Sequence, residues 1–407
     1  MFNIFSSKWV RRAKDMCKQV QKLMNAQRDI LQPPAIIALQ KALNETQDAI
    51  KQRATENALR DQMAALEDAA NKWLKPYPHS SIRENVEVLL VALSVAMAIR
   101  TFFLQPFKIP TGSMQPTLFG VTSDNLRVKS KTGGPQPPGL AQRLFEGCVM
   151  GEFYHYQVAE DDGEIIGIGD VQTVAKFINK TSIEVQYKGR GKTTPYTFWF
   201  TPDDRFAERA GIKLNDHFRK GEPIVNFKET AGDHVFVDRL TYNFRPPRRG
   251  EIIVFETKGT GIRDQNQFYI KRLVALGNEK VQIGDDRHLI IDGKRLDAST
   301  PHFENVYSFD PALPPRKDNF YSGHVNQAVV EQYKLRDDNG NRLFLAPNFS
   351  DQSVVYPMPP NHYMVMGDNT LNSYDSRAWG DFSCTNVIGK YFCVYWPVSK
   401  RIGWVVK

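Results

Sequence analysis

One apolar segment constrains this chain more than any other feature of its sequence. Residues 88–99 contain a single polar side chain, Ser94, and the wider span Val86–Leu104 is 19 residues long with two charges near its ends. About 20 such residues are needed to cross a bilayer as a helix. A buried helix of a soluble protein is the alternative. We favour a transmembrane anchor at residues 84–104, because Arg100 can snorkel and the aromatic residues after it suit a membrane interface.

Positive charge is concentrated before this segment. Residues 1–83 contain 14 lysines and arginines against 8 aspartates and glutamates, which accounts for most of the net charge of +8. Lys72, Lys75 and Arg83 lie directly before the apolar span, so the positive-inside rule places the N-terminus in the cytoplasm. The sequence thus predicts a single-pass protein of the cytoplasmic (inner or plasma) membrane, with everything after the anchor outside.

Residues 1–80 are expected to form a cytoplasmic helical arm. Apolar residues recur at helical spacing over residues 1–32, with lysine and arginine between them, which predicts a basic amphipathic helix. This helix either packs on its neighbour or lies on an anionic membrane surface. After Pro33 and Pro34 a second long helical pattern covers residues 35–74. Its heptad register slips midway, so a helical hairpin and a loose coiled coil are both plausible.

Beyond residue 120 the pattern changes from helical spacing to short alternating runs. Turn signals such as Pro246-Pro247 and Asp292-Gly293 separate these runs, which predicts a mostly β domain. The expected strands cover residues 235–240, 251–255, 268–274 and 289–291.

Composition excludes several classes of protein. Hydrophobic residues make up 41% and charged residues 24% of the 407 residues, so the chain can bury a sizeable core. Four cysteines without a Cys-x-x-Cys pair exclude a disulfide scaffold and disfavour a structural zinc site. No Walker loop, His-Glu-x-x-His or dinucleotide-binding glycine motif occurs. Cys384 and Cys393 either pair outside the cytoplasm or remain free thiols.

The first segment with a chemical signature follows the anchor at residues 109–118. It contains Ser113 after Gly112, which lets the backbone approach a ligand closely, and two prolines that stiffen the loop. An ordinary turn that carries a hydroxyl is the alternative. Ser113 lies nine residues past Leu104. At about 3.3 Å per extended residue, it lies within roughly 30 Å of the membrane face.

A serine nucleophile needs a base, and no histidine has a natural claim to that role. Lys271 lies inside the apolar strand pattern 268–276, where burial would disfavour the ammonium form and lower its pKa. An edge-strand lysine with a solvated head is the alternative. Residues 364–377 form a third cluster, rich in turn-forming and hydrogen-bonding side chains, which can orient a neutral lysine through a hydroxyl. A well-capped turn with an Asp375–Arg377 pair is the alternative there.

Taken in order, these segments resemble the type I signal peptidases, the membrane-bound Ser–Lys peptidases that remove signal peptides. The order is an anchor, a serine box, a strand, a Tyr-Ile-Lys-Arg box and a Gly-Asp-Asn…Ser-x-Asp-Ser-Arg box, and it covers residues 83–120, 232–296 and 360–397. The resemblance implies a mostly β catalytic domain of signal-peptidase-type coiled β-sheets, preceded by the α-helical N-terminal arm and one transmembrane helix. It implies no metal and no cofactor. The implied partners are exported preproteins emerging from the secretion translocon and membrane lipid.

The resemblance also assigns roles to individual residues. Ser113 corresponds to the nucleophile and Lys271 to the general base, and Ser373 matches the serine that hydrogen-bonds the lysine. The backbone N–H of Ser113 and the hydroxyl of Thr111 would form the oxyanion hole. The other matches are pocket residues for small side chains at −1 and −3, namely Phe107, Ile109, Leu118, Tyr269 and Ile270, and bracing residues, namely Arg272, Asp368, Asn369, Asp375 and Arg377.

The chain departs from the family pattern in two supporting turns and in its insertions. Residues 275–279 and 370–371 replace the usual Gly-Leu-Pro-Gly-Asp and Arg-Asp, respectively, without touching the groups that carry the chemistry. The expected divisions are a peptidase domain at 105–120 and 229–407, an inserted region of unknown role at 121–228, and a β subdomain at 297–360.

Two other interpretations fit parts of this pattern. The self-cleaving SOS-response repressors share a serine–methionine step and a strand lysine, but they lack an anchor before the serine and carry a DNA-binding head. Residues 1–75 show no helix-turn-helix pattern, so we expect no nucleic-acid partner. A membrane-tethered interaction protein with a dead site is disfavoured by the intact Ser113, Lys271 and Ser373. We therefore predict a serine endopeptidase that cleaves signal peptides after Ala-x-Ala-type sites.

Overall fold

The structure is a computed structural model of the 407-residue chain. It describes residues 8–75, 80–127, 134–174, 178–201, 205–337 and 340–403. The chain divides into two compact units, Met1–Ser94 and Val95–Lys407. The boundary falls inside one helix, α4 (Ser80–Phe102).

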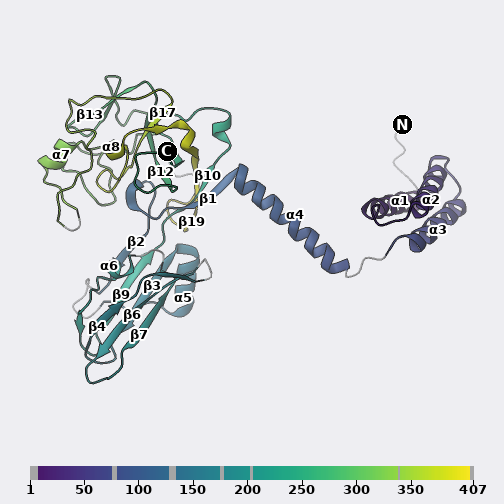
Figure 1. Cartoon of the computed structure of the whole chain (residues 1–407), viewed down its shortest axis with the longest axis horizontal. Helices are drawn as coiled ribbons and strands as arrows, with labels where there is room; N and C mark the ends of the chain where they lie inside the picture. Colours follow the sequence, from purple (N-terminus) through teal and green to yellow (C-terminus); the bar gives the residue numbers. More distant parts are fainter. Residues whose placement is uncertain are drawn as a thin grey trace. The chain divides into compact units, whose positions relative to one another are not determined.

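The first unit contains three amphipathic helices, α1 (Lys8–Ala26), α2 (Pro33–Lys51) and α3 (Glu56–Trp73) (Figure 1). Cys17 and Val20 of α1 are buried in one cluster with Leu39 and Leu43 of α2 and Leu66 of α3. The apolar face of α1 is therefore covered by its neighbours, which is the first of the two alternatives predicted for it.

Of the two alternatives left open for residues 35–74, the structure has the helical hairpin, formed by α2 and α3. The chain leaves the helix after Lys51, and Arg53 adopts a positive φ of 52°. A new helix starts at Thr55, whose side chain accepts a hydrogen bond from the backbone N–H of Ala58. A threonine in this position stabilises a helix start, so the register slip in the sequence marks a break between two helices.

The apolar segment forms α4. Within it, Glu84–Phe102 has a mean hydropathy of 1.7, and none of its apolar window is buried against the rest of the structure. By length and composition, this helix can cross a membrane. The helix stops two residues before the predicted end of the anchor, because strand β1 (Leu104–Lys108) already begins at Leu104.

The main sheet of the second unit has seven strands in the order β1-β10-β19-β11-β12-β17-β18, and its strand pairs are antiparallel. The strands predicted near residues 235, 251, 268 and 289 are confirmed as β10, β11, β12 and β14. The bounds in this part are β10 (His234–Asp238), β11 (Ile252–Glu256), β12 (Phe268–Ala275), β13 (Lys280–Ile283), β14 (Leu289–Ile291), β15 (Lys294–Arg295), β16 (Tyr356–Pro357), β17 (His362–Met366), β18 (Phe382–Ser383), β19 (Val387–Trp396), α7 (Gln327–Gln332) and α8 (Ser376–Trp379).

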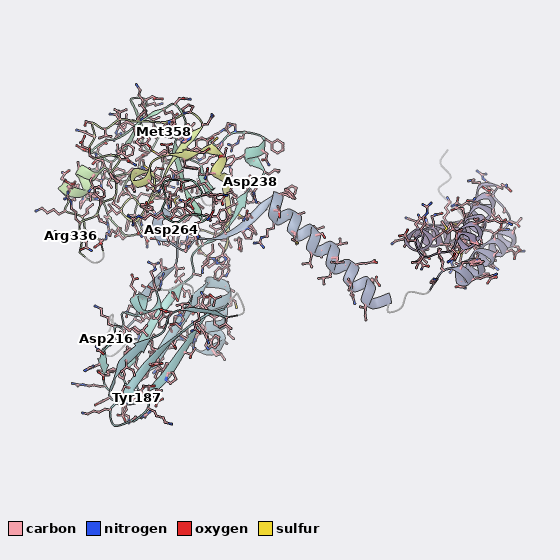
Figure 2. All side chains as sticks on the ribbon, in the orientation of Figure 1. Tyr187, Asp216, Asp238, Asp264, Arg336 and Met358 are labelled. Carbon is pink, nitrogen blue, oxygen red and sulfur yellow. The ribbon has the colours of Figure 1, made fainter. Side chains whose placement is uncertain are left out.

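The inserted region folds as a β unit with its own core. Strands β2, β9 and β3 form one sheet, and β5, β6, β4 and β8 form another, with β7 paired to β6. The core includes Ile165, Ile183, Val185 and Phe227. Figure 2 labels Tyr187 and Asp216 in this part of the unit. The bounds are β2 (Thr122–Asn125), β3 (Glu152–Val158), β4 (Gly163–Ile168), β5 (Gln172–Val174), β6 (Ile178–Tyr187), β7 (Thr194–Trp199), β8 (His217–Phe218), β9 (Pro223–Thr230), α5 (Leu140–Phe145) and α6 (Phe206–Ala210).

The segment 297–360 contains little strand in its described parts, 297–337 and 340–360. It holds the helix α7, the two-residue strand β16 and one isolated bridge between Arg336 and Arg342. The expected β subdomain is therefore mostly loop at this position, and the four-stranded sheet β15-β14-β13-β16 takes three strands from before residue 297. Eight prolines in the segment oppose a ladder, because proline lacks the N–H that a strand donates.

Candidate active site

Two side chains that are far apart in the sequence meet beside the main sheet. Ser113 lies on a short 3₁₀ helix, Gly112–Met114, that begins four residues after β1, and Lys271 lies on β12. The Nζ atom of Lys271 donates a hydrogen bond to Oγ of Ser113 at 2.6 Å. The two residues are only 5% and 6% exposed, so water competes little with this contact.

Burial shifts the acid–base equilibrium of the lysine. Desolvation lowers the pKa of Lys271 from 10.5 to about 8, against the opposing charges of Asp375 and Asp368. The neutral amine is therefore accessible near physiological pH. In that form the same 2.6 Å contact allows Lys271 to take a proton from the serine hydroxyl.

A cavity of about 450 Å³ opens over this pair. Several of the residues singled out in the sequence line it together, namely Ile109, Thr111, Ser113, Tyr269, Ile270, Lys271 and Ser373. Two others lie elsewhere. Leu118 is fully buried in a core cluster, and Phe107 packs against that cluster with its ring edge-on to Phe268 at 5.4 Å.

The two hydroxyls expected beside the dyad differ in their contacts. Oγ1 of Thr111 donates to Oγ of Ser113 at 3.5 Å, a long contact. Ser373 lines the cavity with its Oγ buried, and in the described part of the chain no hydrogen bond joins that atom to Lys271. The hydrogen bond between Ser373 and the lysine thus stays a prediction.

The loop after β17 holds the serine segment in place. The backbone N–H of Asn369 donates to the carbonyl of Ser113 at 3.1 Å, and its side-chain amide donates to the carbonyl of Gly112 at 3.2 Å. A side chain at Gly367 would overlap both Ser373 and the backbone of Ser113. Only glycine permits this close approach between the loop and the serine segment.

Two buried ion pairs brace this loop. Arg272 donates to both carboxylate oxygens of Asp368, at 2.7 and 2.6 Å. Arg377 donates to both oxygens of Asp375, each at 2.9 Å, and Asp375 also accepts from the backbone N–H of Gly367 at 3.0 Å. The Arg272–Asp368 pair thus joins the strand of Lys271 to this loop, and the Arg377–Asp375 pair lies within the loop itself.

Several residues around the site were not singled out in the sequence. Leu343, Phe344 and Leu345 line the cavity from the 297–360 segment, and Tyr374 lines it next to Ser373. The local sequence of residues 343–345 carries no signal for this role, because the folding of the segment brings them there, whereas Tyr374 lies within the 364–377 cluster. The four cysteines are free thiols, and Cys384 and Cys393 are both partly buried.

Comparison with known proteins gives a family match. The family model described as "Signal peptidase, peptidase S26" matches residues 82–135 and 226–396, together more than half of the chain. The unmatched part of the second unit corresponds closely to the inserted β unit.

Individual relatives carry the same name. Signal peptidase I of Bacillus caldolyticus is 25% identical over 215 residues, covering 53% of this chain and 96% of that protein. Signal peptidase I of Aquifex aeolicus (strain VF5) is 30% identical over 182 residues, covering 41% and 70%. Signal peptidase I of Leptolyngbya laminosa is 27% identical over 174 residues, covering 42% of this chain and 63% of its own length, which is less than two thirds.

A solved structure is also similar in sequence. The crystal structure of a signal peptidase I from Enterococcus faecalis V583 is 24% identical, and the match covers 36% of this chain and 97% of that one. Its TM-score of 0.21 is too low to support an argument about the fold. The family match over residues 82–135 and 226–396 decides the assignment: this chain belongs to the peptidase S26 family of signal peptidases.

Proposed function

We propose that the chain is a membrane-anchored serine endopeptidase that removes N-terminal signal peptides from exported preproteins, with Ser113 as nucleophile and Lys271 as general base. The observation that carries the proposal is the 2.6 Å contact between these two buried side chains at the floor of an open cavity. Family membership supplies the substrate class. No metal or cofactor enters the proposed reaction.

The chemistry follows from that contact. Neutral Lys271 takes the proton of Ser113 Oγ while the oxygen attacks the carbonyl carbon of the scissile peptide bond. The backbone N–H of Ser113 and the hydroxyl of Thr111 donate to the resulting oxyanion. The C–N bond then breaks, and Lys271 returns the proton to the leaving amine. The lysine next takes a proton from water while the water oxygen attacks the acyl carbon. The ester bond to Ser113 Oγ then breaks, and Lys271 returns that proton to Oγ.

The proposed preference for small residues before the scissile bond comes from the family resemblance. Ile109, Tyr269 and Ile270, which the resemblance assigns to shallow pockets, line the cavity beside the dyad. An alanine at −1 and at −3 suits such shallow pockets. Phe107 and Leu118 shape these walls from behind, since both belong to the packed cluster under Ile109.

A preprotein with an Ala-x-Ala site is expected to be cut after the second alanine by the detergent-solubilised full-length chain. Replacement of the −1 alanine by leucine should lower kcat/KM by about 10- to 200-fold, because three further carbons do not fit a pocket shaped for a methyl group. Mass spectrometry of the products identifies the bond, and the Ser113→Ala variant serves as the blank. Equal cleavage of both preproteins would refute the pocket assignment, and no cleavage of either would refute the proposed function.

We further propose that Glu84–Phe102 anchors the protein in a single pass, with residues 1–80 in the cytoplasm and the peptidase domain outside. The helix has the length and hydropathy to span a bilayer, and the excess of basic residues lies before it. The partners in this arrangement are membrane lipid and preproteins leaving the secretion translocon.

Cysteine labelling tests this topology. Cys148 is exposed and follows the anchor, so a membrane-impermeant maleimide should label it in intact spheroplasts. A Lys41→Cys variant in which Cys148, Cys384 and Cys393 are replaced by serine carries its new thiol on the exposed face of α2 and should be labelled only after the membrane is permeabilised. The reverse labelling pattern would contradict the proposed orientation.

A further inference from the structure

The strand that carries Lys271 has a free edge only as far as the lysine. Residues 268–272 of β12 pair with β11 on one side. On the other side β17 pairs with β12 from Arg272 onward, where Arg272 lies opposite Met366. Within the described residues, no strand pairs with 268–271 on that side. An extended peptide can therefore add to β12 beside Phe268–Lys271 and no further.

The position of this free edge limits where a substrate can lie on either side of its scissile bond. The acyl part, which ends at the scissile bond near Ser113, can occupy the free edge. The part after the scissile bond cannot continue along β12, because β17 already occupies that edge. Residues 343–345 and 371–374 also line the cavity, so the leaving part can pass over them.

The part of this cavity wall at residues 343–345 is fixed by hydrogen bonds to a buried side chain. Gln327, itself only 5% exposed, fixes the backbone of the segment: its amide donates to the carbonyl of Leu343 at 3.1 Å, and its Oε1 accepts from the N–H groups of Leu345 and Ala346 at 3.1 and 3.3 Å. Leu343 and Leu345 pack against a buried cluster that includes Leu371, which lies in the loop after β17. The segment is thereby tied to the loop that holds Ser113.

Phe344 is the most exposed large apolar residue of this wall. It lies between Leu343 and Leu345, lines the cavity and remains 70% exposed. Tyr374, which is 46% exposed, lines the same cavity from the residue after Ser373. These two aromatic side chains line the cavity and are open to solvent, so they offer apolar contact area to a peptide that passes over them.

We propose that Phe344 and Tyr374 form a leaving-side subsite that selects an apolar side chain within the first three residues after the scissile bond. This inference rests on the proposed function for its substrate, an extended polypeptide cut at Ser113. It adds a second specificity element to the small-residue pockets on the acyl side, and it gives the 297–360 segment a part in substrate choice.

The test compares two peptides that share an Ala-x-Ala site and differ only in having leucine or serine at all of the first three positions after the cut. The full-length wild type should prefer the leucine peptide about tenfold in kcat/KM, a typical value for partial burial of one such side chain. Phe344→Ser should bring this ratio close to one, and Phe344→Leu should restore most of it. Leu313→Ser, a change at another exposed apolar residue of the same segment, should leave the ratio unchanged.

Binding separates this inference from the function on which it rests. Fluorescence anisotropy with the two labelled peptides in a Ser113→Ala background reports the preference without any cleavage, and Phe344→Ser in that background should abolish it. A wild-type ratio near one, or a ratio that survives Phe344→Ser, would overturn the subsite. If the wild type cut neither peptide while the binding preference still depended on Phe344, the subsite would stand and the peptidase assignment would fall.

Discussion

Replacement of Lys271 by methionine should lower kcat/KM for a preprotein substrate by about three orders of magnitude. Methionine keeps most of the volume of the buried side chain but cannot accept the proton of Ser113, so the loss reports the missing base. The exposed Lys258 provides the matched control, and Lys258→Met should retain wild-type activity. The measurement is steady-state cleavage in detergent, with far-UV circular dichroism to check that the variant is folded.

The dependence of kcat/KM on pH in the wild type tests the role of Lys271 independently. The proposed reaction needs neutral Lys271, whose pKa is lowered to about 8 by burial. Hence kcat/KM should rise about tenfold per pH unit below that value, as the ammonium loses its proton, and level off above it. A profile that rises through pH 10 would place the base at an exposed lysine. Full activity of Lys271→Met would remove the lysine from the mechanism.

Replacement of Arg272 by methionine should destabilise the second unit by about 3–5 kcal/mol, because it leaves the carboxylate of Asp368 buried without its partner. Arg272 is 2% exposed, and besides Asp368 it donates to the carbonyls of Gly250 and His302 at 2.8 and 2.9 Å. These bonds tie three separate loops to β12. Pulse proteolysis of the solubilised chain in increasing urea measures the loss.

Two further variants make this result specific. Arg295 pairs with Asp286 at 2.7 Å on the surface, so Arg295→Met should cost less than about 1 kcal/mol. In the double variant Arg272→Met/Asp368→Leu no buried charge is left unpaired, and it should recover part of the lost stability. Equal losses in the single and double variants would show that packing, and not the unpaired carboxylate, explains the effect.

The parts of the fold that could be predicted are those with a local signature. Short apolar runs between turn residues predict strands such as β11 and β12, and a nearly uninterrupted apolar composition predicts α4. The break between α2 and α3 was visible only as a slip in the heptad register. Its cause, a capping threonine at position 55, is a single polar residue in a helical pattern and is easily passed over.

The site shows the same division. Ser113 and Lys271 stand in distinctive segments, and their meeting was expected from the order of those segments rather than from any periodicity. The wall formed by residues 343–345 was not foreseen. Its position depends on Gln327 and on a cluster shared with Leu371, and such contacts between distant residues leave no trace in the local sequence.

The separation of the site residues along the chain also governs when the site comes into existence. The contact between Lys271 and Ser113 spans 158 positions, and the bond from Asn369 to Gly112 spans 257. A polypeptide leaves the ribosome N-terminus first, so the serine is synthesised well before its proposed base and the loop that braces it. A nascent or truncated chain that ends before β17 therefore carries the hydroxyl without the means to activate it. Under the proposed mechanism, peptidase activity therefore arises only after the last strands have joined the sheet.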